Sequence, residues 1–288
     1  MGKRPPKYSA GALIKHGLTR GDWPRMWRRP EMRDSYDVVV IGGGLHGLAT
    51  AYYLAENHGI TNVAVVDKGY IGGGGSGRNT AIVRSNYLTP EGVAFYDRSL
   101  DLYNTMSTDL NLNVMFSRRG HLTLAHTDGA LRTMHWRAEV NKLQGIDSSV
   151  IDPQEVKKQA PSLDVSPNTR YPIMGALYHP PGGIVRHDAV VWGYARAADH
   201  LGVHMLQETE VTDILCEGGE GVVIRVDVDD RDAASTRYSA HLDGQIGRAS
   251  GTDDHKQAGL RDGLHGALGP VALLIIGLVE PQHMRPAP

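Results

Sequence analysis

The sequence predicts an α/β fold whose first unit is a strand, a helix and a second strand. Three observations support this: an apolar run at residues 38–41, glycines at positions 42, 43, 44 and 47 directly after it, and a second apolar run at 62–66 that ends at Asp67. A strand that enters a glycine turn and a helix, followed by a strand that ends on an acid, is typical of the Rossmann-like dinucleotide-binding unit. We therefore expect strands at 38–41 and 62–66, with a helix from about residue 48 to 57.

Each residue type in this turn suits a dinucleotide. Gly42 allows the tight turn, Gly44 lets a pyrophosphate approach the backbone, and Gly47 lets the helix pack close to the strand. The helix N-terminus supplies N–H groups and partial positive charge for the phosphates. Asp67 is placed to accept hydrogen bonds from a ribose diol, and we expect His46 to contact the dinucleotide through its backbone.

A second glycine-rich loop at residues 72–80 favours FAD over NAD. It contains Gly75, Ser76, Arg78 and Thr80, where a simple nicotinamide dehydrogenase usually begins another crossover helix. Such a loop offers backbone N–H groups to a second, bulkier part of the cofactor. A flexible linker is the alternative, but the apolar residues 81–83 follow the loop at once and argue against it.

The remaining elements follow from hydrophobic periodicity, capping and turn signals. Asp152 and Pro153 mark a helix start, and Asp188 is a candidate cap for the last helix. We expect helices at 91–110, 128–145 and 188–201, and strands at 114–116, 121–126, 171–178, 203–206 and 210–215.

Composition excludes several classes of function. The 288 residues carry a formal net charge of −2, which gives no global field for nucleic acid or a membrane surface. Cys216 is the single cysteine, so neither an intramolecular disulfide nor a cysteine metal cluster is expected. We expect no metal site. The late apolar run at 271–279 is too short to span a bilayer, and a cytoplasmic location is expected.

Several motifs extend well beyond the dinucleotide fingerprint. They are the segments 42–54, 58–65, 78–80, 84–88, 170–175 and 186–192. From about residue 8 to 216, they make the chain resemble the beta subunits of heterotetrameric sarcosine oxidases, within the D-amino-acid-oxidase-like flavoprotein family. The resemblance implies a Rossmann-like FAD-binding domain with part of an interleaved α+β substrate domain at 34–216, after an N-terminal extension at 1–33.

The resemblance also implies a reaction. Sarcosine (N-methylglycine) is oxidised by hydride transfer from its N-methyl carbon to a noncovalent FAD. Electrons then pass to a covalent FMN and on to O2, which gives H2O2. The products are glycine and either formaldehyde or methylene-tetrahydrofolate. The implied partners are alpha, gamma and delta subunits, with tetrahydrofolate bound through a partner subunit.

The site residues follow from the same resemblance. Arg84 is the candidate for holding the substrate carboxylate, with Tyr87 beside it in the catalytic set; pairing of Arg84 with a structural acid or a cofactor phosphate is the alternative. His187 is the candidate for the covalent FMN bond, next to Arg186, although a histidine before a helix is more often a cap or surface residue. The complete cofactor-binding set is Gly42, Gly44, His46, Gly47, Asp67, Gly75, Ser76, Arg78, Thr80, Arg186, His187 and Val211.

The resemblance fails after Cys216. Residues 217–288 contain one aromatic residue, Tyr238, and are rich in small and charged residues, so we expect a truncated fold with a poorly structured tail. A reading-frame shift explains the change, and a divergent domain is the alternative. We expect the chain alone to be inactive. Two further readings stay open: a single-flavin oxidase or dehydrogenase of another small N-methyl or secondary amino acid, and a catalytically dead flavoprotein fragment.

Overall fold

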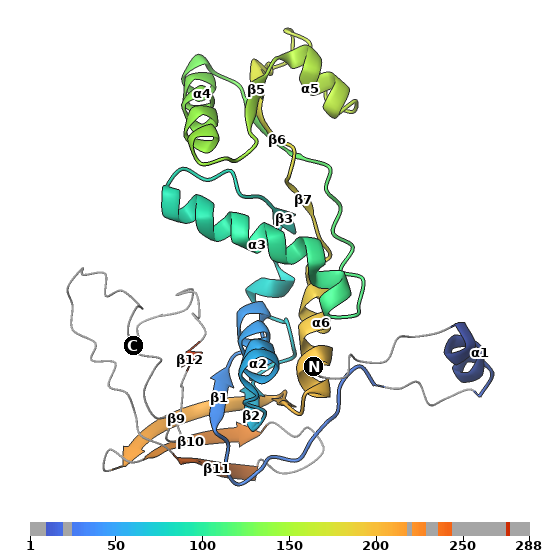
Figure 1. Cartoon of the computed structure of the whole chain (residues 1–288), viewed down its shortest axis with the longest axis vertical. Coiled ribbons are helices and arrows are strands. Elements are labelled where there is room, and N and C mark those ends of the chain that lie inside the picture. Colours follow the sequence, from blue (N-terminus) through green and yellow to red (C-terminus); the bar gives the residue numbers. More distant parts are fainter. Residues whose placement is uncertain (1–9, 20–24, 218–220, 229–235, 244–274, 277–288) are drawn as a thin grey trace. The chain divides into compact units, whose positions relative to one another are not determined.

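The computed structural model of the chain describes residues 10–19, 25–217, 221–228, 236–243 and 275–276 (Figure 1). The chain divides into two units, the first made of residues 1–78 and 191–288 and the second of residues 79–190. Helix α6 (His187–His200) begins in the second unit and continues into the first.

A parallel sheet forms the centre of the first unit. Strands β1 (Val38–Ile41), β2 (Val63–Val66), β8 (His204–Leu206) and β12 (Ile275–Ile276) pair in the order β12-β1-β2-β8. Strands β1 and β2 are continuous apolar runs, as is typical of parallel strands that are covered on both faces. Helix α2 (Leu45–His58) connects β1 to β2. The predicted strand–helix–strand unit is confirmed, and its helix begins three residues earlier than expected.

The first unit also contains an antiparallel sheet. Strand β9 (Thr209–Glu217) pairs with β10 (Gly221–Val228), which pairs with β11 (Thr236–Asp243). We expected low strand content after Cys216, and this is wrong for β10 and β11. The many glycines and charged residues around these two strands obscure the alternation of apolar and polar residues that predicts a strand. Strand β10 nevertheless carries the β-branched residues that strands favour. The other residues of the predicted tail are mostly outside the described part, and the boundaries at 33 and 216 stay predictions.

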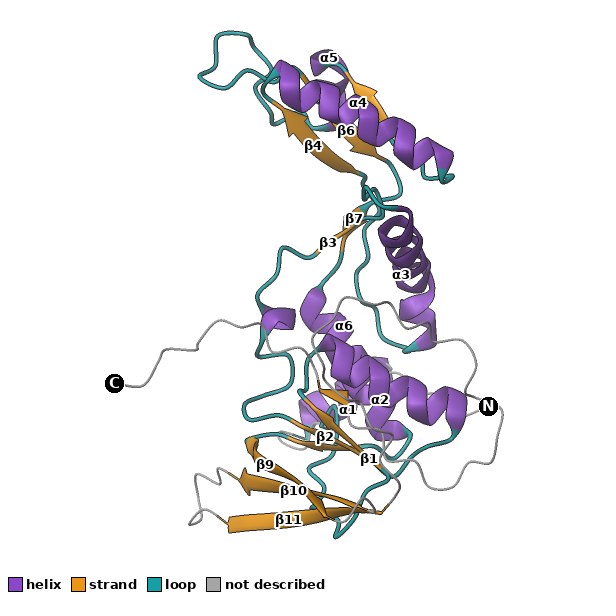
Figure 2. Cartoon of the chain, turned by 90° about the vertical axis from the view of Figure 1, so that its left-hand side faces the viewer, coloured by secondary structure: helices purple, strands orange, loops and turns teal. Residues whose placement is uncertain are grey.

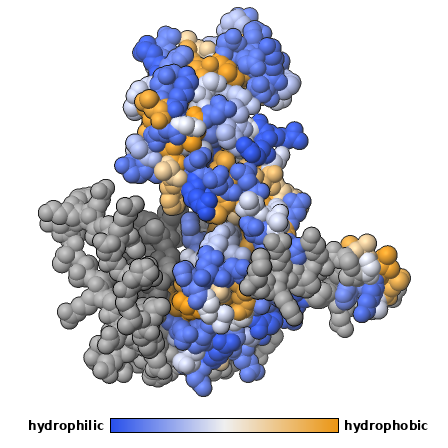
Figure 3. All heavy atoms as spheres, in the orientation of Figure 1, coloured by the Kyte–Doolittle hydropathy of each residue, from blue (hydrophilic) through white to orange (hydrophobic). Residues whose placement is uncertain are grey.

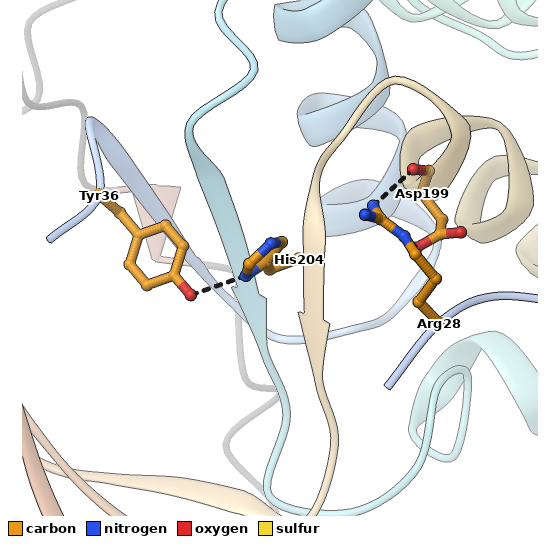
Figure 4. Close-up of polar contacts among 4 residues, drawn as sticks. All are labelled: Arg28, Tyr36, Asp199 and His204. Carbon is orange, nitrogen blue, oxygen red and sulfur yellow. Dashed lines mark hydrogen bonds and ion pairs between the residues drawn. The ribbon is translucent and has the colours of Figure 1, made fainter. Parts of the chain in front are cut away.

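The segment before β1 is attached to the sheet by polar contacts (Figure 4). The Tyr36 hydroxyl lies 3.0 Å from His204 Nδ1, and the Tyr36 ring packs in a buried cluster with apolar residues of β1, β2 and β8. Arg28 donates to the Asp199 carboxylate at 2.9 Å and to the Asp199 carbonyl at 2.8 Å. Helix α1 (Ala10–Leu18) was not expected, and its exposed apolar residues are visible in Figure 3.

The second unit contains a three-stranded antiparallel sheet, in the order β4-β6-β5, made of β4 (His121–Ala125), β6 (Gly175–His179) and β5 (Ser149–Ile151). Helix α4 (Asp128–Leu143) lies along this sheet (Figure 2) and buries Met134 and Ala138 against Leu177. A two-stranded sheet pairs β3 (Ile82–Val83) with β7 (Gly183–Ile184). Helices α3 (Pro90–Asp109) and α5 (Pro153–Gln159) complete the unit.

Local capping explains where these helices begin. Thr89, Thr127 and Asp152 each accept a hydrogen bond at the start of α3, α4 and α5. Asp188 differs from expectation, because α6 begins at His187 and the Asp188 carboxylate instead pairs with Arg186. The expected strand at 114–116 is also wrong, since Met115 adopts a positive φ of 55° that a strand does not allow.

Candidate functional site

The predicted dinucleotide turn lies between β1 and α2 in the first unit. Gly42 has a φ of +109°, a conformation that L side chains rarely adopt. A Cβ at Gly47 would lie 2.0 Å from the Gly42 carbonyl oxygen, so only glycine lets α2 start this close to the turn. Both glycines therefore have the roles that the motif predicts.

Two polar side chains from later segments converge on the same turn. Asp67, at the end of β2, accepts hydrogen bonds from Gly43 N at 2.7 Å and from Gly69 N at 2.8 Å. Ser76 Oγ accepts from Leu45 N at 2.8 Å. We call residues 42–47 with Asp67 and Ser76 the glycine turn. A carboxylate has further acceptor sites on each oxygen, so Asp67 retains the capacity to accept from ribose hydroxyls. These residues fit an FAD dinucleotide.

The other members of the predicted cofactor set lie around this unit in different ways. His46 is exposed on the first turn of α2, next to Gly44, the residue before that helix. Arg78 donates to the Gly73 carbonyl at 2.9 Å, so it closes the glycine-rich loop on itself. Gly75 and Thr80 are exposed in the same segment. Val211 packs, half-buried, against the cluster that contains Tyr36, which makes it a core residue in the described structure.

Arg84 and Tyr87, the two residues of the predicted catalytic set, lie together in the second unit. The Arg84 guanidinium carbon is 4.3 Å from the centre of the Tyr87 ring, a cation–π contact. Arg84 also donates to Asn86 Oδ1 at 3.1 Å. The Tyr87 ring stacks on Tyr96 with centroids 3.9 Å apart. Burial raises the pKa of the Tyr87 hydroxyl, which keeps it neutral.

Two more residues that the sequence did not reveal belong to this cluster. Arg137 of α4 donates to the Asn86 carbonyl at 2.9 Å. His121 of β4 is directly opposite His179 of β6, and burial lowers the His121 pKa to about 4, with help from the charge of Arg84. We call Arg84, Asn86, Tyr87, His121 and Arg137 the arginine cluster. No local motif links residues 84, 121 and 137, because only the tertiary structure brings β4 and α4 beside residues 84–87.

His179 contacts Ser85, the residue between Arg84 and Asn86. It is fully buried, and its Nε2 lies 3.3 Å from both the amide nitrogen and the hydroxyl of Ser85. Its Nδ1 lies 2.8 Å from the Asp147 carbonyl. Since the Ser85 amide donates, Nε2 is the acceptor, and Nδ1 carries the proton toward Asp147. Burial lowers the pKa of His179, which is consistent with this neutral form.

His187 and Arg186, the predicted FMN residues, lie at the start of α6. His187 Nδ1 is buried and has no hydrogen-bond partner among the residues that the structure describes. Arg186 is paired with Asp188, which raises the Arg186 pKa and lowers that of the Asp188 carboxyl. An imidazole nitrogen that no described group occupies is able to form a covalent bond to a flavin, so the described residues fit such a group.

In the described part of the chain, no group of three or more His, Cys, Asp or Glu residues is arranged to hold a metal ion. No described helix combines the length and the apolar character that crossing a membrane requires.

Comparison with known proteins agrees with these features. Residues 37–241 match the family described as FAD dependent oxidoreductase. The chain is 48% identical over 217 residues to sarcosine oxidase subunit beta of Rhodobacter capsulatus, covering 75% of this chain and 52% of that protein. It is 49% identical over 193 residues to the protein of the same name from an Arthrobacter species, covering 67% and 48%. The chain thus spans about half the length of these relatives.

Solved structures show the same fold. L-proline dehydrogenase from P. horikoshii superposes with a TM-score of 0.63 at 25% identity, covering 75% of this chain and 52% of that one. Glycine oxidase from Geobacillus kaustophilus superposes with a TM-score of 0.60 at 23% identity, covering 67% and 52%. The family match extends through β10 and into β11, beyond Cys216, where the sequence resemblance was expected to end.

Proposed function

The chain belongs to the FAD dependent oxidoreductase family, and from that premise we propose that it oxidises sarcosine as the beta subunit of a hetero-oligomeric flavoenzyme. The products are glycine and formaldehyde, or methylene-tetrahydrofolate where a partner subunit holds tetrahydrofolate, and O2 is reduced to H2O2. The partners are alpha, gamma and delta subunits in the cytoplasm. The support is the identity with two proteins named sarcosine oxidase subunit beta, together with the glycine turn and the arginine cluster.

The arginine cluster carries the substrate part of the proposal. Arg84 is held by Asn86 and by the face of Tyr87. It has no ion pair with a carboxylate among the described residues, which argues against the alternative of a structural acid. A guanidinium fork binds a carboxylate through two parallel hydrogen bonds. Such a contact fixes the orientation of sarcosine and therefore the direction of its N-methyl group.

The glycine turn carries the cofactor part. FAD, when bound, supplies a two-electron acceptor for the hydride that leaves the N-methyl carbon. The α2 N-terminus and Gly44 hold the pyrophosphate, Asp67 accepts from the ribose, and Ser76 and Arg78 shape the second loop. The remaining members of the proposed set, His46, Gly75, Thr80 and Val211, contribute backbone or packing contacts. We further propose that His187 holds FMN covalently and that Arg186 supports it.

Acid precipitation tests the two-flavin assignment. We expect one flavin to remain on the polypeptide and one to be released. His187→Ala is expected to lose the covalent flavin, whereas His200→Ala, an exposed residue at the other end of α6, is expected to keep it. Covalent flavin in His187→Ala would contradict the assignment, and one released flavin per chain would favour the single-flavin oxidase or dehydrogenase instead.

The substrate assignment is tested by binding. Arg84→Gln is expected to weaken sarcosine binding by about 10- to 150-fold, the equivalent of about 1.5–3 kcal/mol for a charged hydrogen bond in a dry pocket. Isothermal titration of the FAD-loaded chain measures this without turnover. Unchanged sarcosine affinity in Arg84→Gln would remove Arg84 from the site. Wild-type protein that binds FAD but neither binds nor oxidises sarcosine would instead fit the catalytically dead flavoprotein.

A further inference from the structure

Two guanidinium groups converge on one residue in the arginine cluster. Arg84 donates to the side-chain oxygen of Asn86 at 3.1 Å, and Arg137 donates to its backbone oxygen at 2.9 Å. Asn86 is fully buried. Burial lowers the pKa of Arg137, and the positive charge of Arg84 lowers it further, so the two groups repel each other. The structure thus places two like charges side by side in a partly buried region.

The described carboxylates provide no ion-pair partner for these two guanidinium groups. Among the residues that the structure describes, neither Arg84 nor Arg137 forms an ion pair with a carboxylate. His121 adds no charge of its own, because its lowered pKa leaves the imidazole neutral near pH 7. Partly buried cations are costly unless an anion pairs with them. The charge balance of the cluster is therefore incomplete without a bound anion.

The polar atoms of the cluster are also incompletely paired. Asn86 Nδ2, Arg137 Nε and His121 Nδ1 are buried without a hydrogen-bond partner among the described residues. Buried donors in native proteins are nearly always satisfied, and exceptions cluster where a ligand or a functional group is missing. Three such atoms occur in the same cluster as the two unpaired charges, and both observations indicate a missing ligand.

A purely structural role does not account for Arg137. Its bond to the Asn86 carbonyl ties α4 to the segment after Arg84, and Asn141, one turn along the helix, makes an equivalent bond to the Tyr87 carbonyl at 2.7 Å. The neutral amide of Asn141 shows that tying this segment to α4 does not require a charge. A bound anion explains why a second guanidinium group, and not a second neutral amide, stands at this point.

We propose that Arg137 is a second binding residue for the substrate carboxylate, which lies between the guanidinium groups of Arg84 and Arg137. The proposal rests on the proposed function, since that function assigns the carboxylate to Arg84. The site then selects small amino acids with a free carboxylate and rejects amines that lack one. Two cations make this selection steeper than one, because an amine without a carboxylate meets uncompensated repulsion from both.

The experiment measures sarcosine and dimethylamine binding to the full, FAD-loaded chain by isothermal titration. The variants are Arg137→Gln, Arg137→Lys and Arg84→Gln. Arg132→Gln is the matched control, because Arg132 is an exposed arginine on the same helix. We expect Arg137→Gln to weaken sarcosine binding by about 10-fold or more. Arg137→Lys should recover part of the affinity, and Arg132→Gln should change nothing.

The dimethylamine titration distinguishes the loss of the Arg137 charge from a general disturbance of the fold. Loss of a cation does not weaken binding of a ligand without a carboxylate, so the preference for sarcosine over dimethylamine should fall in Arg137→Gln. Arg137→Met, which keeps the apolar stem, replaces the Gln variant if that protein does not fold. Weakening of both ligands in parallel, or no recovery with lysine, would show a packing role and overturn the proposal.

The outcomes also distinguish the inference from its premise. Weak binding in Arg84→Gln with normal binding in Arg137→Gln overturns only the role of Arg137. Normal binding in both variants overturns the carboxylate site and, with it, the substrate part of the proposed function. A wild-type chain that does not bind sarcosine contradicts both proposals.

Discussion

The glycine turn and the arginine cluster are built in opposite ways. In the glycine turn, the backbone amides of Gly43 and Leu45 already donate to Asp67 and Ser76. In the arginine cluster, side chains converge, and Asn86 and Arg137 retain buried atoms without described partners. The turn is therefore complete as a fold feature, whereas the proposed carboxylate site would be completed by its ligand.

This difference separates the effects of mutation. Changes in the glycine turn should affect folding and the proposed FAD binding together, because the turn that would hold the cofactor is also the start of α2. Changes in the arginine cluster should weaken the proposed binding of the small carboxylate ligand while folding is largely retained.

Gly47→Ala should be the most damaging single change. Its Cβ would lie 2.0 Å from the Gly42 carbonyl oxygen, a distance that backbone atoms relieve only by moving α2. We expect a loss of at least about 3 kcal/mol in the free energy of unfolding, with loss of FAD binding. Urea denaturation and flavin retention measure both. Gly17→Ala, also a helical glycine but with no atom within 4 Å of the added Cβ, is the control and should be neutral or slightly stabilising.

Asp67→Ala should come next. It removes the acceptor for Gly43 N and Gly69 N, so we expect the free energy of unfolding to fall by about 1.5–3 kcal/mol, with weaker FAD binding. Asp67→Asn keeps one acceptor oxygen and should lose less. If FAD affinity in Asp67→Ala equals that of the wild type, the glycine turn is not the dinucleotide site.

Acid should destabilise the arginine cluster through His121. Its pKa is about 4 in the folded protein against 6.5 without burial, so the unfolded chain binds more protons between these values. Stability is therefore fully present above about pH 6.5 and falls as the pH decreases toward 4. Urea midpoints at pH 7 and pH 5 should differ less in His121→Gln than in the wild type. If the difference between the urea midpoints at pH 7 and pH 5 is the same in His121→Gln as in the wild type, His121 does not cause the loss of stability in acid.

The smallest effect belongs to a contact outside both sites. Arg28 is about half exposed where it pairs with Asp199, so Arg28→Ala should cost under about 1 kcal/mol of unfolding free energy. Binding of FAD and sarcosine should not change. Arg29→Ala, an exposed neighbour, is the control. A large loss of either ligand in Arg28→Ala would show that the N-terminal segment takes part in a site.

The same contrast explains what the sequence revealed. The glycine turn is local, so spacing alone predicted Gly42, Gly47 and Asp67 in their places. Strand β1 and most helices were also predicted to within a few residues, since periodicity and capping are local signals. Arg137 and His121 were not predicted, because neither lies in a motif and only the packing of α4 and β4 brings them to Arg84. Strands β10 and β11 were missed because their surroundings in sequence are rich in glycine and charge.

The most direct test of the two-site account is a paired titration of Asp67→Ala and Arg84→Gln. FAD binding is followed by fluorescence quenching and sarcosine binding by isothermal titration of FAD-saturated protein. The account predicts that Asp67→Ala weakens FAD and that Arg84→Gln leaves FAD binding intact while weakening sarcosine by about 10-fold or more. Arg84→Gln that loses FAD, or that binds sarcosine as tightly as the wild type, would contradict it.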